Sequence, residues 1–212
     1  SSSADEVVVV VADAQDAGAP AGCLARHQDR LSTRSVRTLV LGGIRSGKSR
    51  WAEEALASTH SVRYIATGPT ADSDAAWARR IIDHRQRRPP HWITVESADV
   101  ATQLRADPDI PALVDDLGGW LTATLDHRCW DDAPINPEVD DLVAAISGFH
   151  APLALVSPEV GLTVVPMTAA GRRFTDELGA LNQRLAACCE RVVLIVAGQP
   201  VWIKPTPTAT AP

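Results

Sequence analysis

Apolar runs alternate with amphipathic segments along residues 37–204 of this chain. The apolar runs have the length and composition of buried strands, and they lie at residues 38–41, 62–66, 92–96, 111–116, 152–157 and 192–197. Between them, apolar residues recur at helical spacing, which predicts helices at residues 51–58, 74–88, 99–106, 120–126, 138–149 and 171–190. Residues 201–204 are expected to pair at the edge of the sheet. This alternation predicts an α/β fold with a mostly parallel sheet and helices on both faces.

The two ends of the chain differ in composition from this alternating region. Residues 1–36 are rich in Ala, Asp, Ser and Gly and carry one run of valines, so we expect a flexible extension there. Residues 205–212 are rich in Pro and Thr, which predicts a disordered tail. We therefore expect one α/β domain at residues 37–204, without internal repeats.

A glycine-rich stretch follows the first predicted strand. Residues 42–49 read GGIRSGKS and satisfy the P-loop pattern G-x-x-x-x-G-K-[ST], between a strand and a helix as the motif requires. Gly42 and Gly47 let backbone N–H groups point inward at phosphate oxygens. Lys48 is expected to reach the β- and γ-phosphates, and Ser49 to ligate Mg²⁺. A glycine turn that holds nothing is the alternative, but the context favours a P-loop NTPase-type sheet that binds phosphate.

Two adjacent acids end the fourth apolar run. Asp115 stands at the carboxyl end of a predicted strand, where ligands bind in open α/β sheets. An acid there suits the second Mg²⁺ contact of P-loop enzymes, although an acid that only begins a turn is the alternative. Asp116 is expected to point the other way, because successive side chains of a strand alternate. Asp115 is therefore the candidate metal ligand.

A basic cluster lies in an otherwise acidic chain. Residues 79–88 contain five arginines and His84, whereas the net charge of the whole chain is −6. Arginine suits phosphate because its planar fork binds bidentately, but a solvated basic face is an equally good interpretation of the arginines alone. His84 shares a helical face with Trp77 and Ile81, so the pattern alone favours a packed histidine over a nucleophile that attacks an α-phosphate.

Composition limits the partners and the compartment. The net charge of −6 argues against a general nucleic-acid-binding surface, and no apolar run is long enough to span a membrane. No positively charged stretch precedes the first valines, so we expect no secretory signal. The cysteines form no C-x-x-C pair and are expected to be reduced thiols of a cytoplasmic protein; they are Cys23, Cys129, Cys188 and Cys189.

Several segments together resemble one known family. They read TLVLGGIRSGKSRWAEE (38–54), YIATG (64–68), RIIDHRQRRPPHWITVE (80–96), LVDDLGGWLT (113–122), EVGLTVVP (159–166), GRRFTDELGALNQRLA (171–186) and VVLIVAG (192–198). The P-loop is shared by many families, whereas R-I-x-x-H-x-x-x-R-P and G-R-x-F…L-N-Q-R are far more specific. In these segments and their order, the chain resembles the bifunctional adenosylcobinamide kinase / adenosylcobinamide-phosphate guanylyltransferase family of cobalamin biosynthesis.

The resemblance implies a transferase with two activities. Such an enzyme phosphorylates the aminopropanol hydroxyl of adenosylcobinamide with ATP or GTP. It then moves GMP from GTP onto that phosphate through a covalent GMP–histidine, and the family's histidine falls at His84. The resemblance also implies a homotrimer whose partners are adenosylcobinamide, its phosphate, GTP, ATP and Mg²⁺. It places nucleotide contacts at Gly42, Gly43, Ile44, Arg45, Ser46, Gly47, Lys48, Ser49, Ala66, Thr67, Gly68, Arg85, Gln86, Arg87, Arg88, Glu96 and Asp115.

The chain departs from the family's usual pattern at four positions. Ile44 stands where the family usually has Ala, Asp116 where it has Cys, Pro158 where it has Asn, and Thr163 where Gly is frequent. Lys48, His84 and Asp115 are all present. Two other functions stay open: a simple P-loop small-molecule kinase in which His84 is structural, and a non-catalytic nucleotide-binding regulator.

Overall fold

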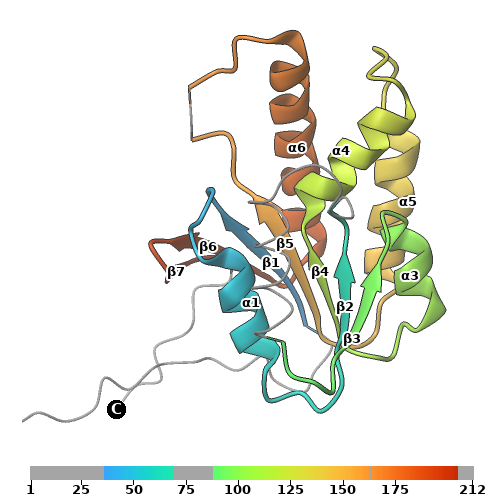
Figure 1. Cartoon of the computed structure of the whole chain (residues 1–212), viewed down its shortest axis with the longest axis vertical. Helices are drawn as coiled ribbons and strands as arrows, with labels where there is room; N and C mark the ends of the chain where they lie inside the picture. Colours follow the sequence, from blue (N-terminus) through green and yellow to red (C-terminus); the bar gives the residue numbers. More distant parts are fainter. Residues whose placement is uncertain (1–35, 69–87, 163, 205–212) are drawn as a thin grey trace, which may run out of the picture.

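The computed structural model, which describes residues 36–68, 88–162 and 164–204, contains a seven-stranded sheet in the order β3-β2-β4-β5-β1-β6-β7 (Figure 1). Neighbouring strands are parallel, except that β7 runs antiparallel to β6. This arrangement confirms the mostly parallel α/β fold that the sequence predicts. The strands are β1 (Arg37–Gly42), β2 (Arg63–Ala66), β3 (Ile93–Glu96), β4 (Ala112–Asp115), β5 (Leu153–Pro158), β6 (Arg191–Val196) and β7 (Gln199–Lys204).

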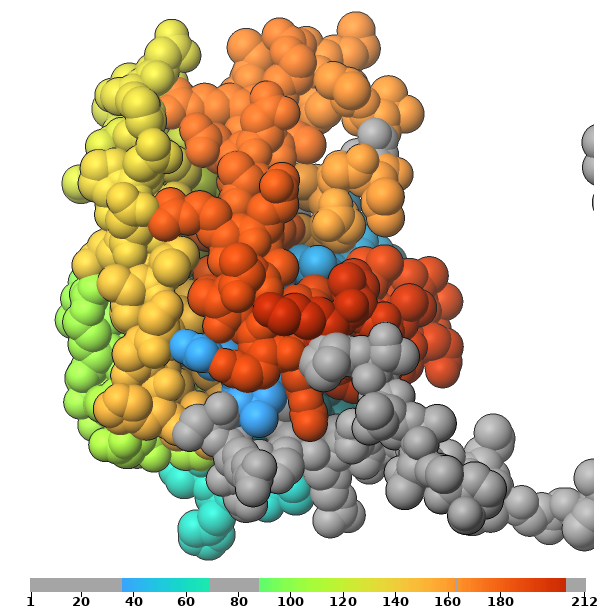
Figure 2. All heavy atoms as spheres, turned by 180° about the vertical axis from the view of Figure 1, so that it is seen from behind, coloured from blue at the N-terminus to red at the C-terminus, as the bar shows by residue number. Residues whose placement is uncertain are grey.

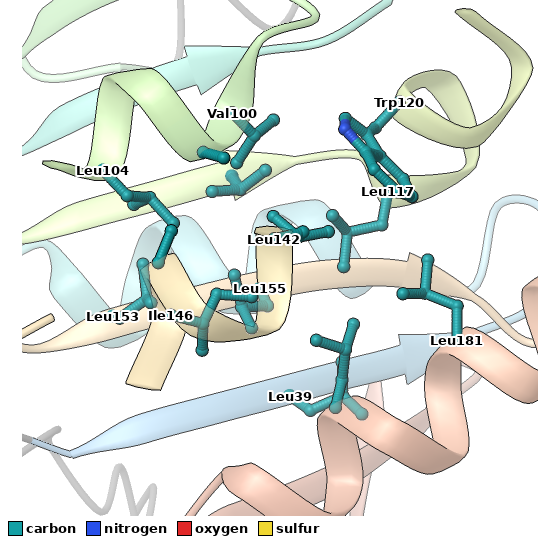
Figure 3. Close-up of a cluster of buried hydrophobic side chains, with 14 of the residues drawn as sticks. Leu39, Val100, Leu104, Leu117, Trp120, Leu142, Ile146, Leu153, Leu155 and Leu181 are labelled. Carbon is teal, nitrogen blue, oxygen red and sulfur yellow. The ribbon is translucent and has the colours of Figure 1, made fainter. Parts of the chain in front are cut away.

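Helices cover both faces of the sheet. One face packs against α1 (Lys48–Leu56), and the other packs against α3 (Val100–Ala106), α4 (Leu117–His127), α5 (Asn136–Ser147) and α6 (Ala169–Cys188). Leu39 and Val40 of β1 are both fully buried although they point to opposite faces, as expected of a strand inside a parallel sheet. Figure 3 shows the larger of the two cores, and Figure 2 shows α5 and α6 covering it from outside.

Side-chain caps fix where three of these helices begin. Asp99 accepts a hydrogen bond from the amide of Thr102 at the start of α3. Asp116 caps α4 in the same way through Gly119, and Thr168 caps α6 through Gly171, so each satisfies an amide that lacks an intrahelical partner.

The structure differs from the sequence prediction mainly at helix ends. The helix α1 begins at Lys48 rather than at residue 51, because the P-loop leads directly into its first turn. The helix α4 begins at Leu117 rather than at residue 120, because Asp116 caps a turn that includes two glycines. Most of the helix expected at 74–88, together with the extension and the tail, lies outside the described residues. Within the described part, no helix has the length and apolarity needed to cross a membrane.

Candidate functional site

Gly42 and Gly47 shape the loop between β1 and α1. A Cβ atom on Gly42 would collide with the Ser46 hydroxyl and lie 2.9 Å from the carbonyl oxygen of Ile195. Gly47 has a φ of 93°, in the left-handed region that glycine adopts without a steric penalty. The loop is held from outside by the amide of Gly198, which donates to the carbonyl oxygen of Ser46 at 2.8 Å. These contacts explain why the motif has glycine at both positions.

Lys48 is the first residue of α1, and its side chain reaches back over the loop. Its Nζ lies 3.4 Å from the carbonyl oxygen of Gly43. The N-cap residue of α1 is Gly47, which has no side chain, and the Lys48 amide donates to the Ser46 hydroxyl at 3.4 Å. An ammonium group above a helix N-terminus provides positive charge from two sources, which is the arrangement that binds phosphate groups.

Ser49 and Asp115 meet although they are 66 residues apart in the sequence. The Ser49 hydroxyl donates a 3.0 Å hydrogen bond to Oδ1 of Asp115 at the end of β4. A hydroxyl and a carboxylate are hard oxygen donors of the kind that Mg²⁺ prefers, so the two side chains fit that ion. Among the described residues, no group of three or more His, Cys, Asp and Glu side chains forms a metal site.

Asp116 has a different role from its neighbour. Its Oδ1 accepts a 2.6 Å hydrogen bond from the amide of Gly119, so it caps α4 instead of continuing the strand as the sequence analysis expects. Burial and the negative charge of Asp115 raise the pKa of Asp116, while the amide hydrogen bonds and Lys48 oppose that rise. Of the two adjacent acids, Asp116 is thus the cap of α4, and Asp115 stays the predicted metal ligand.

The segment that follows β2 packs against this turn. The Thr67 amide donates to the carbonyl oxygen of Asp115 at 3.1 Å, and the Thr67 hydroxyl donates to the carbonyl oxygen of Asp116. A Cβ atom on Gly119 would lie 3.3 Å from Cα of Gly68, so glycine permits this close approach. Ala66, Thr67 and Gly68 thus lie beside the Asp115–Asp116 turn.

Arg88 and Glu96 lie on the β2–β3 side of the sheet. The Arg88 guanidinium carbon stands 3.4 Å from the centroid of the Tyr64 ring, and its Nη1 donates to the Thr94 hydroxyl at 3.1 Å. Glu96 ends β3 in register with Ala66. A shallow pocket here is lined by Arg88, Pro89, Pro90, Trp92, Thr94 and Glu96. The remaining predicted residues of the basic segment lie outside the described residues; they are His84, Arg85, Gln86 and Arg87.

The positions that differ from the family's usual residues are accommodated locally. The side chain of Ile44 is 87% exposed, so it disturbs no packing. Pro158 is the last residue of β5, and a Cβ on Gly118 would lie only 2.8 Å from its ring. Asp116 forms the cap described above, and Thr163 lies outside the described residues.

Two residues near the site are absent from the sequence-based site prediction. The Tyr64 hydroxyl donates to Oδ2 of Asp115, and burial followed by the charge of Asp115 raises the pKa of Tyr64 well above its usual value. Asn182 of α6 accepts from the buried Ser157 hydroxyl at 2.6 Å and donates to the carbonyl oxygen of Pro158 at 3.0 Å. Both are polar side chains at positions that the sequence predicts to be buried, Tyr64 in a strand and Asn182 on the apolar face of a helix. A buried polar group needs a hydrogen-bond partner, and this requirement could have identified both residues from the sequence.

The described candidate residues share one edge of the sheet. The P-loop follows β1, residues 66–68 close β2, and Glu96 and Asp115 close β3 and β4, so all lie at carboxyl ends of parallel strands (Figure 1). Ligands bind at this edge in open α/β sheets. The structure therefore brings the P-loop, Ser49 and Asp115, residues 66–68 and Glu96 to one edge of the sheet.

Comparison with known proteins agrees with this geometry. Residues 38–203 match the family described as "Cobinamide kinase / cobinamide phosphate guanyltransferase". The "Bifunctional adenosylcobalamin biosynthesis protein CobP" of Pseudomonas aeruginosa is 42% identical over 176 residues, covering 81% of this chain and 99% of the relative. The corresponding CobU protein of Salmonella typhimurium is 39% identical over 180 residues, covering 78% of this chain and 98% of the relative.

A solved structure shows the same fold at low sequence identity. An ATPase from the type III secretion system of pathogenic bacteria aligns with a TM-score of 0.50 and 10% identity, covering 76% of this chain and 51% of that one. That likeness concerns the P-loop NTPase fold alone. The extent of the family match and the identity to its curated relatives decide the classification: this chain belongs to the cobinamide kinase / cobinamide phosphate guanyltransferase family and is a transferase of cobalamin biosynthesis.

Proposed function

We propose that this chain phosphorylates adenosylcobinamide and then transfers GMP from GTP to the product, giving adenosyl-GDP-cobinamide. The observation that carries the proposal is the 3.0 Å contact between Ser49 and Asp115 beside the P-loop, in a chain of this family. That contact supports use of a metal–triphosphate complex rather than binding of phosphate alone.

In the kinase step, the aminopropanol hydroxyl attacks the γ-phosphorus of ATP or GTP. A new P–O bond forms, the bond to the β-phosphate oxygen breaks, and the hydroxyl proton passes to solvent. Lys48 binds the β- and γ-phosphates, while Ser49 and Asp115 are the residues that would hold Mg²⁺. When bound, Mg²⁺ neutralises phosphate charge.

In the guanylyl step, a neutral ring nitrogen of His84 attacks the α-phosphorus of GTP. A P–N bond forms and pyrophosphate leaves. A phosphate oxygen of adenosylcobinamide phosphate then attacks the same phosphorus, which breaks the P–N bond and restores the histidine. Arg88 and the neighbouring arginines would stabilise the charge on the transferring group.

The intact mass of the protein tests the covalent step. The chain is incubated with GTP and Mg²⁺ without an acceptor, and an acid-labile gain of one GMP is expected. The gain should vanish in His84→Ala and persist in His150→Ala, a control whose exposed imidazole pairs with Asp109. No adduct on the wild-type chain would leave a simple P-loop kinase or a nucleotide-binding regulator.

Turnover with a corrinoid acceptor separates these two functions. A simple kinase would form adenosylcobinamide phosphate and stop, and it would do so equally well in His84→Ala. A regulator would bind GTP and release neither pyrophosphate nor nucleoside diphosphate when adenosylcobinamide is added. The proposed enzyme would form adenosyl-GDP-cobinamide, and only its second step would be lost in His84→Ala.

We also propose a homotrimer, as the family resemblance implies. The edge formed by β6 and β7 exposes Val196, Val201 and Ile203, which offers an apolar strip for another copy to cover. Light scattering coupled to size-exclusion chromatography should give the mass of three chains. A monomer or dimer mass across the working concentration range would contradict this assembly.

A further inference from the structure

Tyr64 lies between the two parts of the candidate site. It belongs to β2, in register with Leu113 of β4 on one side and Thr94 of β3 on the other. Its side chain is 1% exposed and belongs to the core that α1 covers. Asp115 follows Leu113 by two residues and so points to the same face, within reach of a long side chain on the neighbouring strand. This register brings the phenol to the carboxylate.

The Tyr64 hydroxyl and the Ser49 hydroxyl hold different oxygens of one carboxylate. Tyr64 donates to Oδ2 of Asp115, and Ser49 donates to Oδ1. A metal ion at this position would draw on Ser49 and Oδ1, whereas the bond from Tyr64 to Oδ2 remains compatible with it. Donors of this kind fix the orientation of a ligating carboxylate and are worth a large factor in metal affinity.

The face of the same ring carries Arg88. The guanidinium carbon lies 3.4 Å from the ring centroid, and Nη1 is held by the Thr94 hydroxyl on the adjacent strand. A guanidinium stacked on an aromatic ring gains from the ring's negative face and keeps its planar orientation. Tyr64 therefore contacts two proposed site residues: its hydroxyl contacts Asp115, and its ring contacts Arg88.

We propose that Tyr64 is a positioning residue that orients Asp115 through its hydroxyl and Arg88 through its ring. One side chain thereby contacts both Asp115, the proposed metal ligand, and Arg88, which is proposed to bind the guanylyl group being transferred. The inference rests on the proposed function, because it assumes that both residues meet the nucleotide. It adds a role that neither the P-loop pattern nor the resemblance assigns to this position.

Tyr64→Phe tests the hydroxyl. The probe is an α,β-methylene analogue of GTP, which cannot release pyrophosphate, and its dissociation constant is measured calorimetrically with EDTA and with saturating Mn²⁺. The metal-free constant should stay unchanged, while the gain in affinity from Mn²⁺ should fall on the order of tenfold. Equal Mn²⁺ gains in Tyr64→Phe and wild type would overturn the proposed hydrogen-bond role.

Tyr64→Leu tests the ring. Loss of the stacked face should weaken metal-free binding about threefold to tenfold, an effect that Tyr64→Phe lacks. Arg88→Gln should lose at least as much, because it removes the guanidinium itself, and the double variant should be no weaker than Arg88→Gln alone, since Tyr64 acts through Arg88. Additive losses, or a Tyr64→Leu chain that folds and binds like wild type, would overturn the ring's role. Tyr64→Met, which also lacks an aromatic face, replaces Tyr64→Leu if the latter does not fold.

A buried hydroxyl elsewhere provides the matched control. Thr38 is fully buried on β1, and its hydroxyl has no hydrogen-bond partner among the described residues, so Thr38→Val should leave both constants unchanged. Thermal unfolding confirms that each variant is folded. If wild type itself gains no affinity from Mn²⁺, the proposed function fails and this inference falls with it. If wild type gains affinity and Tyr64→Phe gains as much, only this inference fails.

Discussion

The hydroxyl of Ser49 and the carboxylate of Asp115 are joined by a 3.0 Å hydrogen bond between the first turn of α1 and the end of β4. Under the proposed function, these two side chains would hold the Mg²⁺ that accompanies a triphosphate. Asp115→Asn preserves the shape and the ability to accept hydrogen bonds but removes the charge. We expect kcat/KM of the kinase step to fall at least on the order of a hundredfold.

The measurement is steady-state phosphorylation of adenosylcobinamide over a range of Mg²⁺ concentrations. Asp109→Asn is the control, because Asp109 is an exposed acid paired with His150. Retention of wild-type kcat/KM by Asp115→Asn would remove Asp115 from the metal position.

Gly42 has no room for a side chain. Gly42→Ala would drive its Cβ into the Ser46 hydroxyl and to 2.9 Å from the backbone oxygen of Ile195, so the loop must shift. We expect a stability loss of about 1–3 kcal/mol together with loss of nucleotide binding. Both are measured by denaturant unfolding with and without GTP.

Gly179→Ala is the matched control for this substitution. Apart from its chain neighbours and the nearby backbone of α6, no atom of the described residues lies within 4 Å of a Cβ at Gly179, so the added methyl group should stabilise the helix by about 0.5–1 kcal/mol. It should leave nucleotide binding intact. A Gly42→Ala chain that binds GTP as well as Gly179→Ala does would contradict the steric argument.

Asp116 should behave as a cap and not as a metal ligand. Asp116→Ala removes the acceptor for the Gly119 amide and should cost about 1 kcal/mol of unfolding free energy, whereas Asp116→Asn should keep most of the cap. Asp99→Ala, which removes the equivalent cap of α3, is expected to show a similar loss. Urea unfolding measures all three. A large loss of Mg²⁺-dependent activity in Asp116→Asn would show that the assignment of the two acids is reversed.

The parts of the fold and of the site that could be predicted from the sequence are those that short, contiguous patterns encode. Each apolar run encodes a strand through its own residues, and the P-loop is contiguous, so strand identity and the position of Lys48 follow from short stretches. Asp115 could be chosen because a strand end is itself a local feature. The residues proposed to hold a metal could be selected only as far as these local signals extend.

Contacts between distant segments could not be predicted in the same way. The sheet order places β4 between β2 and β5, and periodicity alone carries no information on which strands are neighbours. Tyr64 and Asp115 are 51 residues apart, so their hydrogen bond depends on that order. The apolar run predicts a strand that includes Asp116, whereas its capping role depends on a turn geometry that the residue type does not fix. The role of His84 stays a prediction.

Asn182 should couple α6 to the P-loop. Its amide joins Ser157 and the carbonyl of Pro158, and the next amide, of Glu159, donates to the carbonyl oxygen of Gly42 at 3.0 Å. Asn182→Ala leaves a buried hydroxyl and a carbonyl without these partners and should cost about 1–3 kcal/mol. The KM for nucleotide should rise as well, because the loop loses its support.

Ser157→Ala separates these two effects. It removes one hydrogen bond but leaves the bond between Asn182 and Pro158, so stability should fall while the KM for nucleotide stays near wild type. The double variant Ser157→Ala/Asn182→Ala should be less destabilised than the sum of the singles, because they share a bond. Full additivity would argue against the shared network.

The ion pair between Arg37 and Glu190 should make stability depend on pH. Burial raises the pKa of Glu190, but hydrogen bonds from the Arg37 side chain and amide outweigh burial and hold that pKa below its usual value. A carboxyl with a lowered folded-state pKa contributes stability above its unfolded-state pKa, about 4.3, and loses it as pH falls through the folded-state value. The melting temperature of Glu190→Gln should therefore lie below that of wild type at pH 7, and the difference should shrink below about pH 4.

Scanning calorimetry between neutral and acidic pH measures this difference. Glu54→Gln is the control, because Glu54 forms an exposed pair with Arg50 on α1 that solvent screens, so its variant should differ little from wild type at any pH. A constant difference between Glu190→Gln and wild type at every pH would indicate that the ionisation of Glu190 carries no folding energy. A difference that widens in acid would reverse the sign and show that burial, rather than Arg37, sets the pKa of this carboxyl.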